Sequence, residues 1–308
     1  MVYAYQRAGW HDAAVLERLD GVDWARITHA YGPATDVPDL IKDLCATDPD
    51  RREKARWQLY GNIFHQGTRY EATAYAVPFL LEVLADVECA DQGELVRLLA
   101  AIAVGYDEFW LPDGLPIEEQ RRAAEGGAML LAAAPHPGDD EWDEDEGDAQ
   151  YIEALSPQEQ EAMLAHVSLA AYEAVRRGVP LYRALLREDD TGVRTAAAYL
   201  LGWFPEDAEG TLPALAATAG SDVDDALAAT ARVSMGLLGA ANEFDDARPV
   251  VRWATAIGQV RVFGAGAGQE AVDELRAWAG GAGRDERVPF LDGDLVGYAT
   301  LAVDRLAP

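Results

Sequence analysis

Polar aromatic residues, a histidine and a glutamate lie close together between positions 57 and 75. The group comprises Trp57, Tyr60, Asn62, His65, Tyr70, Glu71 and Tyr75. Trp57 and Tyr60 are three residues apart, so a helix would place them on one face. Aromatic side chains with a polar tip are typical of sites that bind a ligand or a protein. We therefore expect a binding surface here. The alternative is that the rings fill a junction between neighbouring segments, with His65 bonding to a backbone carbonyl in a turn.

Sequence signals for metal binding, cofactor binding and catalysis are weak. None of the five histidines belongs to a His-Glu, His-x-His or His-x-x-x-His pattern, and paired ligands one turn apart are what a metal needs on a helix. The Gly-x-Gly-x-x-Ala pattern at Gly266, Gly268 and Ala271 would need a preceding strand to bind a dinucleotide. We interpret it as a linker and expect no metal and no cofactor. An enzyme that uses His65 and Glu71 as acid and base is the alternative to a binding protein.

Acidic residues dominate the charge, with 54 Asp and Glu against 25 Lys and Arg and a net charge of −29. This charge repels nucleic acids and anionic membranes and attracts basic protein faces. We therefore expect no nucleic-acid or membrane partner, and a protein partner with a basic face. Asp222, Asp224 and Asp225 form an acidic cluster that we include among the candidate binding residues. The alternative is that the acidic residues only keep the protein soluble, and a small-molecule ligand stays open.

An internal repeat would position these residues. The segment 37–61, VPDLIKDLCATDPDRREKARWQLYG, aligns without a gap with 179–203, VPLYRALLREDDTGVRTAAAYLLGW. Partial copies begin at prolines 78, 213, 249 and 289. The intervals between neighbouring copies fall within the range of roughly 20 to 50 residues that indicates stacked structural repeats, here helical pairs. Pro180 suits a first helical turn, and Glu188 to Gly192 predict the turn between two helices.

These residues resemble HEAT repeats, in which a proline-bearing helix, an Asp-containing turn and a helix opening with Val-Arg form one unit. The similarity is strong over 37–104 and 179–241 and weak over 105–178 and after 242. The segment 22–84 further resembles a group of bacterial HEAT-repeat proteins with no established activity. The resemblance implies an all-α fold, an α-solenoid of stacked antiparallel helix pairs. The abundance of Ala and Leu and the short β-branched runs predict essentially no strand. It also implies that Trp57 and Tyr60 line the concave side.

We expect one solenoid over 1–308. Its parts are a cap (1–36), the first repeats (37–104), an irregular helical region (105–178) with an acidic loop (137–150), further repeats (179–241) and C-terminal helices (242–308). Within it we predict helices at 116–134, 157–177 and 294–306. Thr68 and Glu71 match a capping box. Eight acids between Asp139 and Asp148 predict a solvated loop.

The chain has no membrane-length apolar stretch, and its N-terminus lacks the apolar core of a signal peptide. Cys45 occupies an apolar helix position, where we expect a buried thiol. These features favour a cytoplasmic protein. Its expected function is that of a non-enzymatic binding scaffold, or an inhibitor or immunity-type protein, that uses the concave face of a solenoid. The alternative is an enzyme of a biosynthetic or lyase-like kind, with a small-molecule pocket in the groove.

Overall fold

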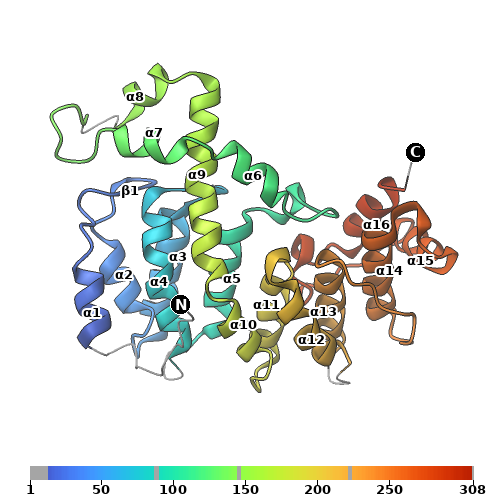
Figure 1. The fold of residues 1–308 in the computed structure, drawn as a ribbon. Helices are drawn as coiled ribbons and strands as arrows, with labels where there is room; N and C mark the ends of the chain where they lie inside the picture. Colours follow the sequence, from blue (N-terminus) through green and yellow to red (C-terminus); the bar gives the residue numbers. More distant parts are fainter. Residues whose placement is uncertain (1–12, 87–89, 144–146, 221–223, 307–308) are drawn as a thin grey trace. The chain divides into compact units, whose positions relative to one another are not determined.

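A computed structural model describes residues 13–86, 90–143, 147–220 and 224–306. The chain forms two units, one from Met1–Gly105 with Pro116–Gly178 and one from Tyr106–Leu115 with Val179–Pro308. Both are mostly helical (Figure 1). The predicted all-α class is confirmed at that level, and the described helices pack largely against neighbours in sequence. The HEAT-type solenoid and its single continuous stack stay predictions.

Unit 1 contains nine α-helices and two short hairpins in its described part. Its elements are α1 (Ala13–Asp20), β1 (Thr28–His29), β2 (Gly32–Pro33), α2 (Val37–Asp43), α3 (Pro49–Asn62), β3 (Phe64–His65), β4 (Thr68–Arg69), α4 (Glu71–Ala85), α5 (Gln92–Val104), α6 (Ile117–Ala123), α7 (Gly127–Ala133), α8 (Ala149–Ala154) and α9 (Pro157–Arg176). Both hairpins are antiparallel. They correct the expectation of essentially no strand, although each strand has only two residues.

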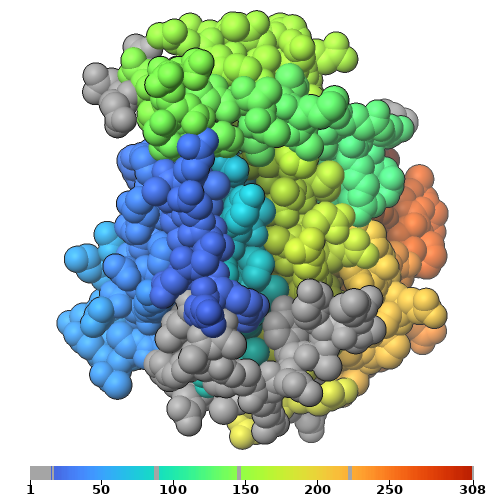
Figure 2. All heavy atoms as spheres, turned by 60° about the vertical axis from the view of Figure 1, so that its left-hand side comes forward, coloured from blue at the N-terminus to red at the C-terminus, as the bar shows by residue number. Residues whose placement is uncertain are grey.

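Helix α9 organises the core of unit 1. It packs against α4, α5, α6 and α7, which come from both halves of the unit (Figure 1). Its N-terminus is fixed by a capping box, in which Ser156 N donates to Glu159 Oε2 at 2.8 Å and Glu159 N donates to Ser156 Oγ at 3.3 Å. The predicted helix at 157–177 is therefore confirmed. Residues 116–143 lie over one end of the N-terminal helices (Figure 2).

Several predicted helix boundaries are wrong. The helix expected over 116–134 is divided into α6 and α7, because Gly126 adopts a left-handed φ of 84° that a continuing helix does not allow. Pro78 was expected near a helix start, yet it lies inside α4, which begins at Glu71. Pro213 likewise lies inside α12. The positions of these two prolines therefore do not predict helix ends.

The acidic segment is not solvated along its whole length. Asp139 accepts hydrogen bonds from His136 N at 2.9 Å and from Arg26 Nη2 at 2.8 Å, and Asp148 is half-buried ahead of α8. The expectation of a solvated loop is corrected for these two residues. Residues 144–146 lie outside the described residues.

Unit 2 has seven α-helices and four 3₁₀ turns in its described part. They are η1 (Asp107–Phe109), α10 (Val179–Leu185), α11 (Thr191–Leu201), η2 (Pro205–Asp207), α12 (Ala208–Ala219), α13 (Asp225–Leu237), α14 (Pro249–Phe263), η3 (Gly264–Gly266), α15 (Gln269–Ala279), η4 (Phe290–Gly293) and α16 (Leu295–Asp304). Helix α16 confirms the predicted C-terminal helix, and Asp294 caps it by accepting from Gly297 N at 2.8 Å.

Helix α13 is the centre of unit 2. Every residue from Ala226 to Leu237 is buried, and α13 packs against α11, α12 and α14. It approaches α14 most closely at Gly236, where an added Cβ would lie 2.6 Å from the Cα of Gly258. The two helices can pack this closely only because position 236 is glycine.

Candidate functional site

The candidate aromatic residues of unit 1 lie on α3, on the β3–β4 hairpin and at the start of α4. Asp48 caps α3 by accepting from Asp50 N at 3.1 Å. The hairpin turn has Gln66 at φ 50° and Gly67 at φ 86°, values that suit a two-residue turn between antiparallel strands. The chain between Trp57 and Glu71 therefore reverses direction within a few residues.

Arg69 of strand β4 fixes this hairpin to the C-terminal end of α5. Its guanidinium donates to the carbonyls of Ile102 and Ala103, at 2.8 Å and 3.1 Å, in the last turn of α5. It also donates to the carbonyl of Gly67 at 3.0 Å and lies over the Phe64 ring, 5.8 Å from the centroid. Burial lowers the pKa of Arg69 to about 10. This arginine caps a helix C-terminus, and it was not among the predicted site residues.

A first group of rings comes from α3 and β3. Trp57 and Tyr60 make an edge contact with centroids 6.0 Å apart, and Tyr60 makes another with Phe64 at 5.0 Å. Phe64 is fully buried, whereas 64% of Trp57 is exposed. The buried end therefore anchors the group, and Trp57 presents its ring to solvent.

A second group forms around Tyr31, which sequence reasoning missed. The Tyr31 ring lies 5.4 Å from His65, its hydroxyl is 3.4 Å from His65 Nδ1, and 67% of the residue is exposed. Burial, followed by the nearby Tyr31, raises the pKa of Tyr70. We call Tyr31, Trp57, Tyr60, His65 and Tyr70 the aromatic site.

A part-buried polar network supports Tyr31. Tyr31 N donates to His29 Nδ1 at 3.1 Å, so the other ring nitrogen, Nε2, carries the proton that His29 shares with Asp36 Oδ1 at 2.9 Å. Asn62 Nδ2 donates to the other oxygen of Asp36 at 2.6 Å, and Asn62 O accepts from Ala30 N at 3.0 Å. The predicted binding residue Asn62 therefore has a positioning role, since it ties the β1–β2 hairpin to the end of α3.

Glu71 has a different neighbour from the one the sequence indicates. Its Oε2 lies 3.8 Å from His136 Nδ1, while the described contact of His65 is with Tyr31. Burial raises the pKa of Glu71, although His136 and a bond from Thr28 N oppose this, and Asp148 adds to it. Burial also raises the pKa of Asp148. Glu71, His136 and Asp148 thus form a half-buried titratable cluster.

The predicted capping box is wrong by two residues. Thr68 belongs to β4, and α4 begins at Glu71 with Tyr70 as its cap residue. Tyr70 N donates to Thr73 Oγ1 at 2.8 Å, and that hydroxyl donates to the carbonyl of Ile63 at 2.6 Å. Glu71 therefore does not close the cap and is left to face His136.

In the acidic cluster of unit 2, both described members have internal partners. Asp224 caps α13 by accepting from Leu227 N at 2.9 Å and lies 3.4 Å from Arg287 Nη1. Asp225 accepts from Arg248 Nη1 at 3.0 Å. Asp222 lies outside the described residues.

A half-buried carboxylate in unit 2 is a further titratable group that the sequence did not indicate. Asp107 Oδ2 accepts from Tyr199 Oη and from Leu291 N, each at 3.1 Å. Burial raises the pKa of Asp107 to about 6 although both hydrogen bonds lower it, and the nearby Asp292 and Glu108 raise it further. Leu291 and Asp292 hold left-handed φ angles of 48° and 50°. Both hydrogen-bonding partners are far from Asp107 in sequence, so no local motif marks this site.

Two properties of the described residues bear on partners. They contain no group of three or more His, Cys, Asp or Glu that could hold a metal ion. None of the helices in the described ranges is long and apolar enough to cross a membrane.

Cys45, expected as a buried thiol, is instead partly exposed and disulfide-bonded.

Comparisons with known proteins leave the family open. The chain matches no protein-family model, and no curated protein matches it significantly. One similar solved structure is the crystal structure of an engineered protein from the Northeast Structural Genomics Consortium. It is 17% identical, with a TM-score of 0.32, over 88% of this chain and 68% of that one.

Proposed function

We propose that this protein is a non-enzymatic binding protein that holds a basic protein partner at the aromatic site. The observation that carries the proposal is the exposure of Trp57 and Tyr31, 64% and 67%, on rings that make edge contacts with the half-buried Tyr60 and His65. Rings of this kind lose little conformational entropy on binding and are frequent hot spots. The alternative, in which the rings fill a junction between neighbouring segments, does not explain why Tyr31 and Trp57 lie mostly in solvent.

The charge of the chain supports a basic partner. The net charge of −29 favours basic over acidic partners, and the Debye length of about 8 Å at physiological salt limits this attraction to charges near the contact. Arg and Lys side chains also stack on Trp and Tyr rings. An inhibitor or immunity-type role follows from this combination, because such a protein neutralises a basic target by covering its surface. The sequence predicts the cytoplasm as its compartment, but the Cys45 disulfide counts against this prediction, because disulfides are rare in cytosolic proteins.

A comparative capture experiment tests the proposal. Tagged wild-type protein, Tyr31→Ala, Trp57→Ala and Phe109→Ala are used as baits in a lysate of the source cell. Phe109 is the matched control, since it is an aromatic residue of unit 2 with 68% exposure. A basic protein that wild type and Phe109→Ala retain, and that the other two variants lose by about tenfold, supports the proposal.

The enzyme alternative now depends on Glu71 and His136 instead of Glu71 and His65, because their 3.8 Å approach joins an acid of raised pKa to an imidazole. Turnover of a generic ester, glycoside or phosphate substrate by wild type that Glu71→Gln abolishes would favour this alternative. The binding proposal predicts no such turnover.

A further inference from the structure

The two copies of the internal repeat place an arginine at the same position, with different surroundings. In the gapless alignment of 37–61 with 179–203, Leu44 corresponds to Leu186 and Arg52 to Arg194. Leu44 and Arg52 line a cavity in unit 1, and Leu186 and Arg194 line a cavity in unit 2. The first copy therefore shows which partners satisfy the hydrogen bonds of an arginine at this position.

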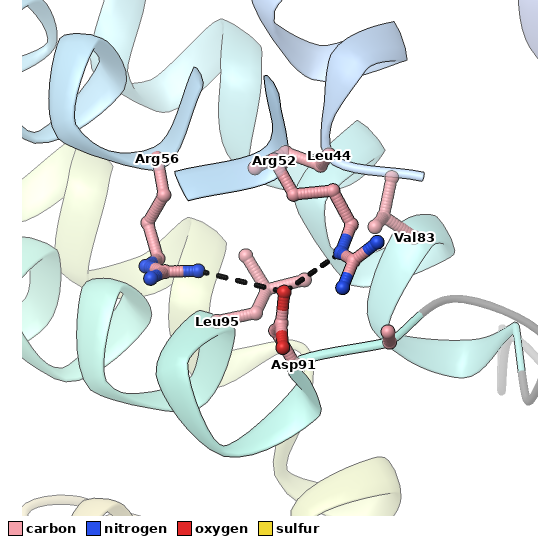
Figure 3. Close-up of a pocket in the computed structure, with 7 residues that line it drawn as sticks. Leu44, Arg52, Arg56, Val83, Asp91 and Leu95 are labelled. Atoms are coloured by element: carbon pink, nitrogen blue, oxygen red, sulfur yellow. Dashed lines mark hydrogen bonds and ion pairs between the residues drawn. The ribbon is translucent and has the colours of Figure 1, made fainter. Parts of the chain in front are cut away.

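In the first copy the arginine is neutralised by a carboxylate of the chain. Arg52 Nε donates to Asp91 Oδ2 at 2.8 Å, and Arg56 Nη1 lies 3.8 Å from the same oxygen (Figure 3). Arg52 Nη1 also donates to the carbonyl of Ala46 at 2.9 Å. The remaining cavity holds only about 10 Å³. Asp91 thus occupies the place that an external anion would take.

In the second copy the cavity is open and basic. It measures about 390 Å³ and lies among α10, α11 and α12. Its lining comprises Arg183, Leu186, Arg187, Glu188, Asp189, Arg194, Ala214, Ala217 and Thr218. Within the described ranges, none of the three arginines forms an ion pair. Arg194 Nε is buried and has no hydrogen-bond partner among the described residues. A buried donor of this kind needs an acceptor, and the described protein does not provide one.

Arg183 and Arg187 are four residues apart, at the end of α10 and just beyond it, and they replace Ile41 and Cys45 of the first copy. Gly210 on α12 makes room for Arg183, because a Cβ there would lie 2.1 Å from Arg183 Nη1. Glycine at this position therefore lets a guanidinium pass close to the helix backbone.

The charge of the lining selects the ligand. The lining contains three arginines and two acidic residues, Glu188 and Asp189, which are both exposed residues of the turn. A ligand that has the role in this cavity that Asp91 has in the first copy must be an anion. Three guanidinium groups match a dianion better than a single carboxylate. Guanidinium groups bind phosphate oxygens in pairs through short, charge-assisted hydrogen bonds.

We propose that the cavity of Arg183, Arg187 and Arg194 binds the phosphate group of a small organic phosphate. The cavity volume leaves room for a further part of the molecule beside the phosphate itself. This site is separate from the aromatic site and does not depend on the proposed function.

Titration calorimetry on the full chain tests the proposal, with inorganic phosphate, pyrophosphate and succinate as probes at constant ionic strength. We expect saturable binding of phosphate with a Kd on the order of 1 mM, tighter binding of pyrophosphate, and weaker binding of succinate. Arg187→Gln and Arg183→Gln should each weaken phosphate binding by about tenfold. Gly210→Ala should weaken it as well, because the added Cβ displaces Arg183.

Arg97→Gln is the matched control, since Arg97 is exposed on α5 and pairs with Glu94 at 2.5 Å. It should leave binding unchanged. Arg187 is itself exposed, so its variant should keep the wild-type melting temperature and remain informative even if Arg183→Gln does not fold. The absence of saturable phosphate binding, an equal loss in Arg97→Gln, or succinate binding as tight as phosphate would each overturn the proposal.

Discussion

The raised pKa of Asp107 predicts that this carboxylate destabilises unit 2 at neutral pH. Its folded-state pKa is about 6, against an ordinary value of 3.8. Below pH 3.8 the group is protonated in both folded and unfolded chains and costs nothing. As the pH rises, the unfolded chain loses the proton first, so stability falls until the folded group ionises near pH 6. With about 1.36 kcal/mol for each pKa unit, the total loss is about 3 kcal/mol.

Asp107→Asn removes this titration and keeps an oxygen that can accept from Tyr199 Oη and Leu291 N. The free energy of unfolding of the variant, relative to wild type, should rise by about 1.4 kcal/mol between pH 5 and pH 8. Urea unfolding at both pH values measures the difference, and other titrating groups cancel because both proteins contain them. A constant difference across this range, or one that falls with pH, would refute the assignment of a raised pKa to Asp107.

Three further predictions concern stability and are each checked by urea unfolding. Arg69→Gln should lower the free energy of unfolding by about 2–4 kcal/mol, because it leaves the carbonyls of the last turn of α5 without their charged donor. A decrease below about 0.5 kcal/mol would contradict that role. Gly236→Ala should cost about 1–3 kcal/mol, since its Cβ would overlap α14, whereas Gly266→Ala, where nothing lies within 4 Å, should be nearly neutral. Equal effects at the two glycines would show that the helix contact is not close. Ser156→Ala should cost about 1 kcal/mol through loss of the α9 cap, and an unchanged midpoint would show that the cap is not formed.

Local signals in the sequence predicted the starts of α9 and α16, whereas the capping box expected at Thr68 and Glu71 is wrong by two residues. Ser156 and Glu159 mark the start of α9, and Asp294 marks α16, because a capping side chain and its backbone donor are only three residues apart. The helical class also follows from the internal repeat, since the intervals between neighbouring copies fall within the range that indicates helical pairs. Pro78 misleads because it lies inside α4, which begins earlier, at Glu71.

The candidate site was predicted only where it is local. Trp57 and Tyr60 were found because helical spacing places them together. Tyr31 was missed because its contact with His65 joins two hairpins that are well separated in sequence. Glu71 was found, but its partner His136 comes from the irregular helical region, which no repeat aligns with Glu71. Contacts made by folding alone leave no spacing to read in the sequence.

The central claim is that the exposed rings of the aromatic site hold a basic protein partner. Once a basic partner has been captured, biolayer interferometry on purified components tests this claim most directly, by comparing wild type with Trp57→Ala and Phe109→Ala at about 0.05 M and about 0.15 M salt. The account predicts about tenfold weaker binding for Trp57→Ala, unchanged binding for Phe109→Ala, and slower association at the higher salt. Equal affinities for Trp57→Ala and wild type, with an association rate indifferent to salt, would contradict it.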